Sequence, residues 1–138
     1  MFVVGLESNG NLYAYVLNHS TGVARRVATI VTGFTAVMGM EYDRDTGALW
    51  IMCDSHCRNA LGVLEVGSSA SRSPGTFQLA GPYAKPASLP DVNNEGFAIA
   101  PQSACVANRK PAFWADDDAT GGHALHSAGM PCSVNPFR

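Results

Sequence analysis

Short apolar runs alternate with turn sequences along most of this 138-residue chain. Gly, Asn, Asp and Pro gather between the runs, as they do where strands are joined by tight turns. No stretch combines a 3.6-residue apolar period with capping residues, so no helix is predicted. The pattern predicts an all-β chain. The expected strands are Phe2–Leu6, Leu12–Leu17, Val23–Val31, Ala36–Tyr42, Ala48–Cys53, Leu61–Val66, Thr76–Ala80, Asn94–Ala100, Pro111–Ala115 and Gly122–Ala128.

Composition narrows the class of protein. Hydrophobic residues make up 46% of the chain and charged residues 14%, which is too apolar and too weakly charged for intrinsic disorder. The formal net charge of -2 provides no basic surface, so we expect no nucleic-acid partner. No apolar run approaches the roughly 18 residues that a membrane helix requires, so we expect no membrane partner.

Two segments of the chain resemble each other. Gly39–Asp43 aligns with Gly96–Ala100, and Ala48–Asp54 aligns with Ala112–Asp118. In each copy a glycine opens an apolar strand, a turn follows, and a second strand carries a Trp with an Asp just past it. Self-similarity of this kind in an all-β chain is typical of propeller blades, which pack face to face around an axis.

The repeat predicts a single partial β-propeller domain of about three blades. The alignment pairs Trp50 with Trp114, which we interpret as packing between blades, and it pairs Asp54 with Asp118. Three blades leave two faces uncovered, and propellers usually close with four to eight. We therefore expect the chain to associate with itself, two copies forming a six-bladed ring. The approximate blade boundaries are residues 1–33, 34–82 and 91–132.

The repeated segments resemble the blade motifs of phytase-like and esterase-like bacterial β-propeller proteins. The motifs are Gly39–Trp50 and Asn94–Phe97, and the similarity covers mainly Ala36–Cys132. This family is related in architecture to calcium-dependent six-bladed propeller hydrolases, which include lactonases and phosphotriesterases. The chain departs from the family in length, and Met38 stands where the second copy has Glu95. The resemblance implies a propeller and, beyond that, a calcium-dependent hydrolase.

The densest group of charges consists of Asp116, Asp117 and Asp118, directly after an expected strand. Adjacent carboxylates repel one another unless a cation or the backbone donors of a turn compensate them. A calcium site and a solvated turn are the two alternatives. Because side chains alternate along a strand, at most two of the three carboxylates can point the same way.

A second group of oxygen donors, Asn93, Asn94 and Glu95, opens the innermost strand of the third expected blade. Carboxylate and amide oxygens are ligands that calcium prefers, and such a strand opening lies near the end of a propeller channel. An ordinary turn that enters a strand is the alternative. The expected calcium ligands are Glu95, Asn93, Asn94, Asp116 and Asp118.

His123 and Asp117 are the expected catalytic residues. Imidazole titrates near neutral pH, so His123 suits a general base, although it may be replaced in this role by a carboxylate. A solvated histidine is the alternative for His123, and Asp54 fits a turn better than a channel. The predicted function is a metal-dependent hydrolase of small ester or phosphoester substrates. The alternatives are a non-catalytic propeller module with a structural ion, and a fragment of a larger propeller.

The four cysteines divide into a close pair, Cys53 and Cys57, and a distant pair, Cys105 and Cys132. Two disulfides with this pairing would suit an exported protein, so we expect a secreted or periplasmic location. The first residues nevertheless lack the basic and long apolar regions of a secretory signal. A zinc site formed by His56 with the close pair is a weaker alternative, because a structural zinc site usually has a second closely spaced pair of ligands.

Overall fold

A computed structural model describes residues 1–66 and 76–132. Over these ranges the chain forms ten strands and three short 3-10 turns, with no α-helix. The strands build three antiparallel sheets with the orders β1-β2-β3, β4-β5-β6-β7 and β10-β9-β8. The prediction of an all-β chain is confirmed.

The bounds of the elements follow the three sheets. The first sheet contains β1 (Phe2–Gly5), β2 (Leu12–Asn18) and β3 (Val23–Ile30). The second contains β4 (Gly39–Asp43), β5 (Ala48–Met52), β6 (Leu61–Val66) and β7 (Phe77–Tyr83). The third contains β8 (Asn94–Ile99), β9 (Arg109–Asp116) and β10 (Leu125–Pro131). The 3-10 turns are η1 (Ser55–Cys57), η2 (Gln102–Ala104) and η3 (Thr120–Gly122).

Each expected strand has an observed counterpart, and the main differences lie at strand ends. β4 begins at Gly39 rather than at Ala36, because Val37 donates its backbone N–H to Leu6 of the neighbouring sheet. β7 runs beyond Ala80, and β10 begins later than expected because η3 precedes it. Contacts with other sheets and a tight turn therefore set these boundaries.

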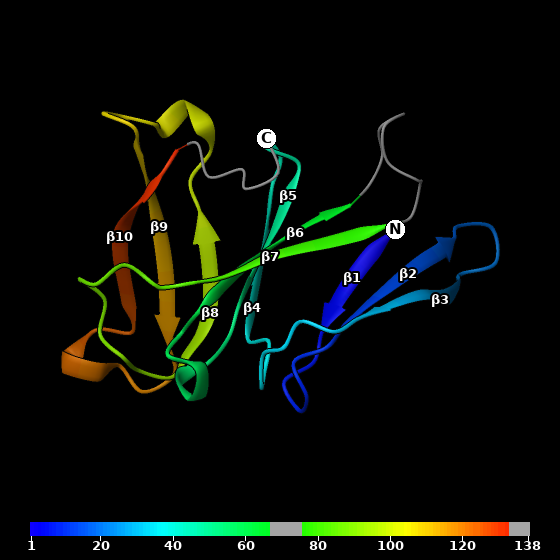
Figure 1. Ribbon diagram of the computed structural model, residues 1–138, viewed down its shortest axis with the longest axis horizontal. Coiled ribbons are helices and arrows are strands. Elements are labelled where there is room, and N and C mark those ends of the chain that lie inside the picture. Colours follow the sequence, from blue (N-terminus) through cyan, green and yellow to red (C-terminus); the bar gives the residue numbers. More distant parts are fainter. Residues whose placement is uncertain (67–75, 133–138) are drawn as a thin grey trace.

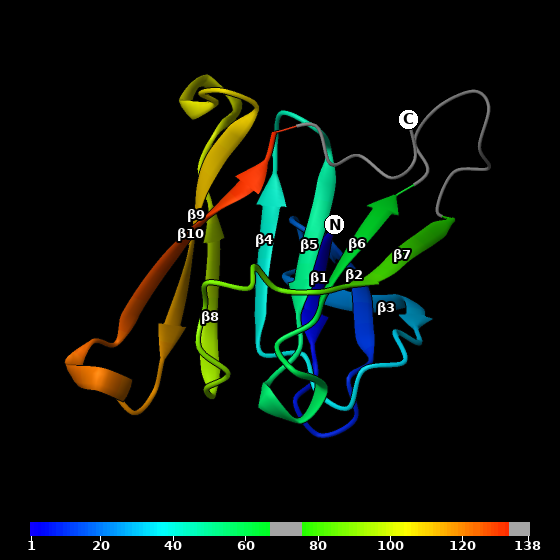
Figure 2. The ribbon, with the colours of Figure 1, turned by 60° about the vertical axis from the view of Figure 1, so that its left-hand side comes forward.

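The second sheet packs between the other two (Figure 1), and Figure 2 shows the same arrangement from another side. One apolar cluster, which includes Leu12 and Ile51, lies between the first and second sheets. A second cluster lies between the second and third sheets, where Phe97 contacts both Trp50 and Trp114. Burying large side chains on both faces of the middle sheet holds three small sheets together as one unit.

The strand registers define a structural repeat. Gly39 of β4 lies opposite Met52 of β5, and Gly96 of β8 lies opposite Ala115 of β9. Met52 and Ala115 therefore occupy equivalent positions in their sheets. This repeat is offset by one residue, along the second strand of each pair, from the alignment that the sequence suggests.

The offset changes the interpretation of the tryptophans. Trp50 is equivalent to Phe113, and Trp114 is equivalent to Ile51. The prediction that Trp50 and Trp114 occupy equivalent positions is wrong, although both pack between sheets: they reach the same cluster from opposite sides. The turns before these strands differ in length, so sequence alone left the register open. A shift of one residue reverses the face on which a side chain lies.

A buried ion pair also joins the second and third sheets. Lys110 Nζ of β9 lies 2.8 Å from Asp43 Oδ2 of β4, and the two side chains are 2% and 4% exposed. Burial acts to raise the pKa of Asp43, but the hydrogen bond and the positive charge of Lys110 outweigh it and lower the pKa below its ordinary value of 3.8. Asp43 is therefore ionised and paired at neutral pH.

Two disulfides are present, Cys53–Cys57 and Cys105–Cys132, and this is the pairing expected from the sequence. Disulfides form and persist in oxidising compartments, which is consistent with an exported protein. Among the described residues, no helix has the length and apolar character needed to cross a membrane.

Candidate functional site

An acidic residue occupies the same position in all three sheets, just past the end of β1, β5 and β9. In each case the preceding residue donates its backbone N–H to the segment that enters the next strand, so the three positions correspond. These strands all run toward the lower side of Figure 1. The three acidic residues are Glu7, Asp54 and Asp117. The residue equivalent to Asp54 is therefore Asp117, which corrects the expected pairing of Asp54 with Asp118.

Glu95, near the start of β8, lies close to these three carboxylates. The pKa of Glu95 is raised above its ordinary value of 4.5, first by burial, then by the negative charges of Asp117 and Glu7, and to a smaller degree by that of Asp54. A hydrogen bond from Asn93 acts in the opposite direction without cancelling the rise. We call Glu7, Asp54, Glu95 and Asp117 the acidic cluster.

Asn93 connects two members of the acidic cluster. Its Nδ2 donates hydrogen bonds to Glu95 Oε1 at 2.9 Å and to Asp117 Oδ2 at 3.0 Å. The backbone N–H of Asp117 in turn approaches the carbonyl of Asn93 at 3.4 Å. The structure thus brings together three of the residues singled out from the sequence, from two separate segments of the third sheet.

Asn94 has a different set of contacts. It is 2% exposed, and its Nδ2 donates to Asn59 Oδ1 at 3.0 Å and to the carbonyl of Val92 at 3.3 Å. Asn59 passes the connection on to Asp91 Oδ1, at 2.9 Å. Asn94 therefore belongs to a buried polar network between the loops of the second and third sheets, and no hydrogen bond joins its side chain to Glu95 among the described contacts.

The run of three aspartates divides into three environments. Asp116 is buried, its Oδ1 accepts the backbone N–H of Asp118 at 3.0 Å, and its Oδ2 lies 3.8 Å from His126 Nε2. Asp117 faces Asn93, whereas Asp118 and His123 are exposed to solvent. The turn interpretation therefore fits Asp116 and Asp118, and the site interpretation fits Asp117.

One histidine contacts the acidic cluster directly, and sequence reasoning did not select it for catalysis. His56 Nδ1 lies 2.8 Å from Asp54 Oδ2, and the His56 side chain is 79% exposed. Asp54 also caps η1, because its Oδ1 accepts the backbone N–H of His56 at 2.9 Å. An imidazole oriented by a carboxylate, with its other nitrogen open to solvent, has the geometry of a general base.

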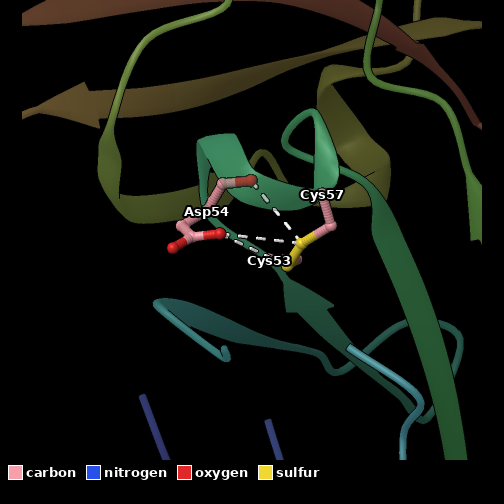
Figure 3. Close-up of side chains that lie close together, drawn as sticks. All are labelled: Cys53, Asp54 and Cys57. Atoms are coloured by element: carbon pink, nitrogen blue, oxygen red, sulfur yellow. Dashed lines mark hydrogen bonds between the residues drawn. A yellow bond between two sulfur atoms is a disulfide. The ribbon is translucent and has the colours of Figure 1, made fainter. Parts of the chain in front are cut away.

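The Cys53–Cys57 disulfide lies beside Asp54 (Figure 3). Asp54 Oδ1 is 3.6 Å from Cys53 Sγ and 3.7 Å from Cys57 Sγ. Among the described residues, only these three place His, Cys, Asp or Glu ligand atoms within 4.8 Å of one another. In the disulfide form the sulfurs are not thiolates, so the zinc alternative does not apply to the oxidised chain.

Comparisons of the chain with protein families, with curated proteins and with solved structures gave no match. The resemblance to phytase-like and esterase-like propellers therefore rests on the two blade motifs alone and stays a prediction. The geometry of the acidic cluster is the independent basis for assigning a function.

Proposed function

We propose that this chain binds calcium at the acidic cluster and uses it to hydrolyse an ester or phosphoester bond in a small molecule. The observation that carries the proposal is the convergence of carboxylates from all three sheets at one end of the molecule. Uncompensated negative charge there raises the pKa of Glu95, and a bound cation would relieve it.

The proposal includes the architecture. We infer that the three sheets are consecutive blades of a β-propeller, which is supported by their shared register and by their face-to-face packing. The acidic cluster then lies at the mouth of the channel. A second copy of the chain would complete a six-bladed ring and would bring its own acidic cluster to the same channel.

The residues present fit calcium as a loosely held ion. Glu95 and Asp117 are drawn toward each other by their shared hydrogen-bond donor, Asn93, and they supply two carboxylate ligands. Glu7 and Asp54 add negative charge at longer range. Calcium tolerates irregular geometry and completes its coordination with water, whereas magnesium requires a stricter arrangement. Two direct carboxylates place the affinity in the weak range, with a Kd of about 10⁻⁴ to 10⁻³ M.

Calcium in this position would polarise the carbonyl or phosphoryl oxygen of the substrate. The water that attacks the substrate needs a base, and we assign this role to His56. Its Nε2 would take the proton of the water, while Asp54 holds Nδ1 and stabilises the imidazolium that forms. His123, the base expected from the sequence, is the competing assignment.

A non-catalytic binding module is the second candidate, and one contact favours it. Asn93 already satisfies one oxygen of Glu95 and one of Asp117 without an ion. A propeller that binds a partner through its loops would need no more than such a hydrogen-bonded turn, with any ion in a structural role.

Hydrolysis of chromogenic carboxylate and phosphate esters, in calcium and in excess chelator, separates the two candidates. The enzyme hypothesis predicts turnover that chelation abolishes. Replacing the base should lower kcat by about 10²- to 10⁴-fold, so His56→Ala should be impaired and His123→Ala should not. The reverse pattern would restore His123 as the base. Calcium that raises the melting temperature without any turnover would favour the binding module.

A further inference from the structure

The turn that carries the Cys53–Cys57 disulfide holds three potential metal ligands. We propose that reduction of this disulfide creates a binding site for a thiophilic divalent cation, with zinc the expected ion. The ligands would be the thiolates of Cys53 and Cys57 and the carboxylate of Asp54. This site goes beyond the calcium function, because it exists only in the reduced chain and selects a different class of metal.

The ligand atoms already have the spacing of a zinc site. Bonds of about 2.3 Å to sulfur and 2.0 to 2.2 Å to oxygen place neighbouring ligands in a tetrahedral site roughly 3.5 Å apart. Asp54 Oδ1 lies 3.6 Å and 3.7 Å from the two sulfurs. Figure 3 shows the Asp54 carboxylate turned toward the sulfur of Cys57. Reduction removes the bond between the sulfurs and lets them separate around an ion.

The surroundings of these atoms supply the outer contacts that metal ligands need. The second carboxylate oxygen of Asp54 is held by His56 Nδ1 at 2.8 Å. Thr35 Oγ1 lies 3.7 Å from Cys53 Sγ and 3.8 Å from Cys57 Sγ, where its hydroxyl can donate to a thiolate. Outer contacts of this kind orient ligands and commonly change metal affinity by about 10- to 100-fold.

The ligand set favours zinc over calcium. Thiolates bind zinc, cadmium and cobalt, whereas calcium prefers oxygen ligands throughout. Cys53 is fully buried and Cys57 is half-buried, so an ion can enter from the side of Cys57. Three protein ligands leave a fourth position for water or for the exposed imidazole of His56.

The chemistry balances with a dithiol as reductant. The S–S bond breaks, each sulfur gains one electron and one proton, and the dithiol is oxidised to its own disulfide. Binding of the divalent ion then displaces the two thiol protons to solvent, because the thiolate is the ligand.

Cobalt is the probe, because thiolate-bound tetrahedral cobalt absorbs where the free ion does not. The full chain, reduced with a dithiol and desalted without oxygen, should develop thiolate-to-cobalt absorption that saturates at about one ion per chain, and zinc should abolish it. The oxidised chain should show none. Asp54→Asn should weaken cobalt binding at least tenfold, and His56→Ala should weaken it by a similar factor. The matched control is the C105S/C132S double variant, which should bind as the natural chain does.

Three results would overturn the site. The first is absence of the absorption in the reduced chain, and the second is its persistence in the C53S/C57S double variant. The third is equal affinity in Asp54→Asn and in the natural chain, because two thiols of an unfolded segment would bind cobalt without help from the carboxylate. Circular dichroism recorded on the same samples shows whether the β-sheet signal survives reduction. The measurement uses calcium-free buffer and no substrate, so its outcome is independent of the hydrolysis test.

Discussion

At the scale of single residues, Glu95 is the group whose charge the fold accommodates least well. Its pKa lies above 4.5 in the folded chain, so the ionised form is disfavoured by folding. The stability that this group contributes is therefore fully present below about pH 4.5 and is lost as the pH rises through the folded pKa. In chelator at pH 7, Glu95→Gln should melt at a higher temperature than the natural chain, and the difference should vanish below about pH 4.5.

Calcium should reverse that order, because the natural chain gains a ligand-linked increase in melting temperature that the variant loses. Differential scanning calorimetry across pH, with and without calcium, checks both parts. A melting temperature that is equal for the two chains at every pH would show that the carboxylates around Glu95 do not act on it.

The sequence identified part of the candidate site. Asn93, Glu95 and Asp117 could be chosen because oxygen-donor side chains gathered at expected strand ends, and the structure brings these three together. Glu7 and His56 could not be chosen as site residues, since their relevance depends on how three sheets stack. An Asp two residues before a His at a turn was visible, but many turns contain this pattern.

At the scale of elements, the contact between the second and third sheets depends on a pair of opposite charges. Lys110→Met would leave Asp43 buried without its partner, and breaking such a pair costs about 3 to 5 kcal/mol. Replacing both residues, as Asp43→Leu with Lys110→Met, should restore most of this loss, because a well-packed apolar pair avoids the desolvation penalty.

Chemical denaturation of the single and double variants measures this coupling. The pKa of Asp43 is lowered, so its contribution to stability is present above about pH 3.8 and is lost as the pH falls through the folded pKa. The natural chain should therefore lose stability below about pH 3.8 by a term that the double variant lacks. Equal stability of Lys110→Met and the natural chain would contradict the account.

The strands were predictable because alternating apolar positions and turn residues both appear in the local sequence. Their registers were not, since a one-residue shift changes neither composition nor turn pattern yet moves Trp50 from the position of Trp114 to that of Phe113. Register depends on which faces are buried between sheets, and this is information that a single strand does not contain.

At the scale of the whole molecule, the repeat shows what is uncovered on the two outer faces. Phe113 is 37% exposed, while its equivalent in the middle sheet, Trp50, is buried against the third sheet. Val4 is 42% exposed, while its equivalent, Ile51, is buried against the first sheet. Each outer face thus lacks the neighbour that the same face has within the chain, and we propose that a second copy supplies both.

Light scattering on a size-exclusion column tests this pairing. We expect a mass near twice 14.5 kDa, and Phe113→Glu should convert the dimer to a folded monomer, because a charge on the contact face opposes burial. Ser127→Glu, on an exposed position opposite Phe113 in β10, is a second disruption on the same face. A monomeric mass at every concentration would contradict ring closure by a second copy.

Calcium binding measured by titration calorimetry on the oxidised chain tests the central claim most directly. The account predicts saturable binding with a Kd of about 10⁻⁴ to 10⁻³ M, weakened at least tenfold by Glu95→Gln. Glu41→Gln, which removes a carboxylate of β4 outside the acidic cluster, should leave the affinity unchanged. The absence of binding at millimolar calcium, or an affinity that Glu95→Gln leaves intact, would contradict the assignment of a cation site to the end where the three sheets converge.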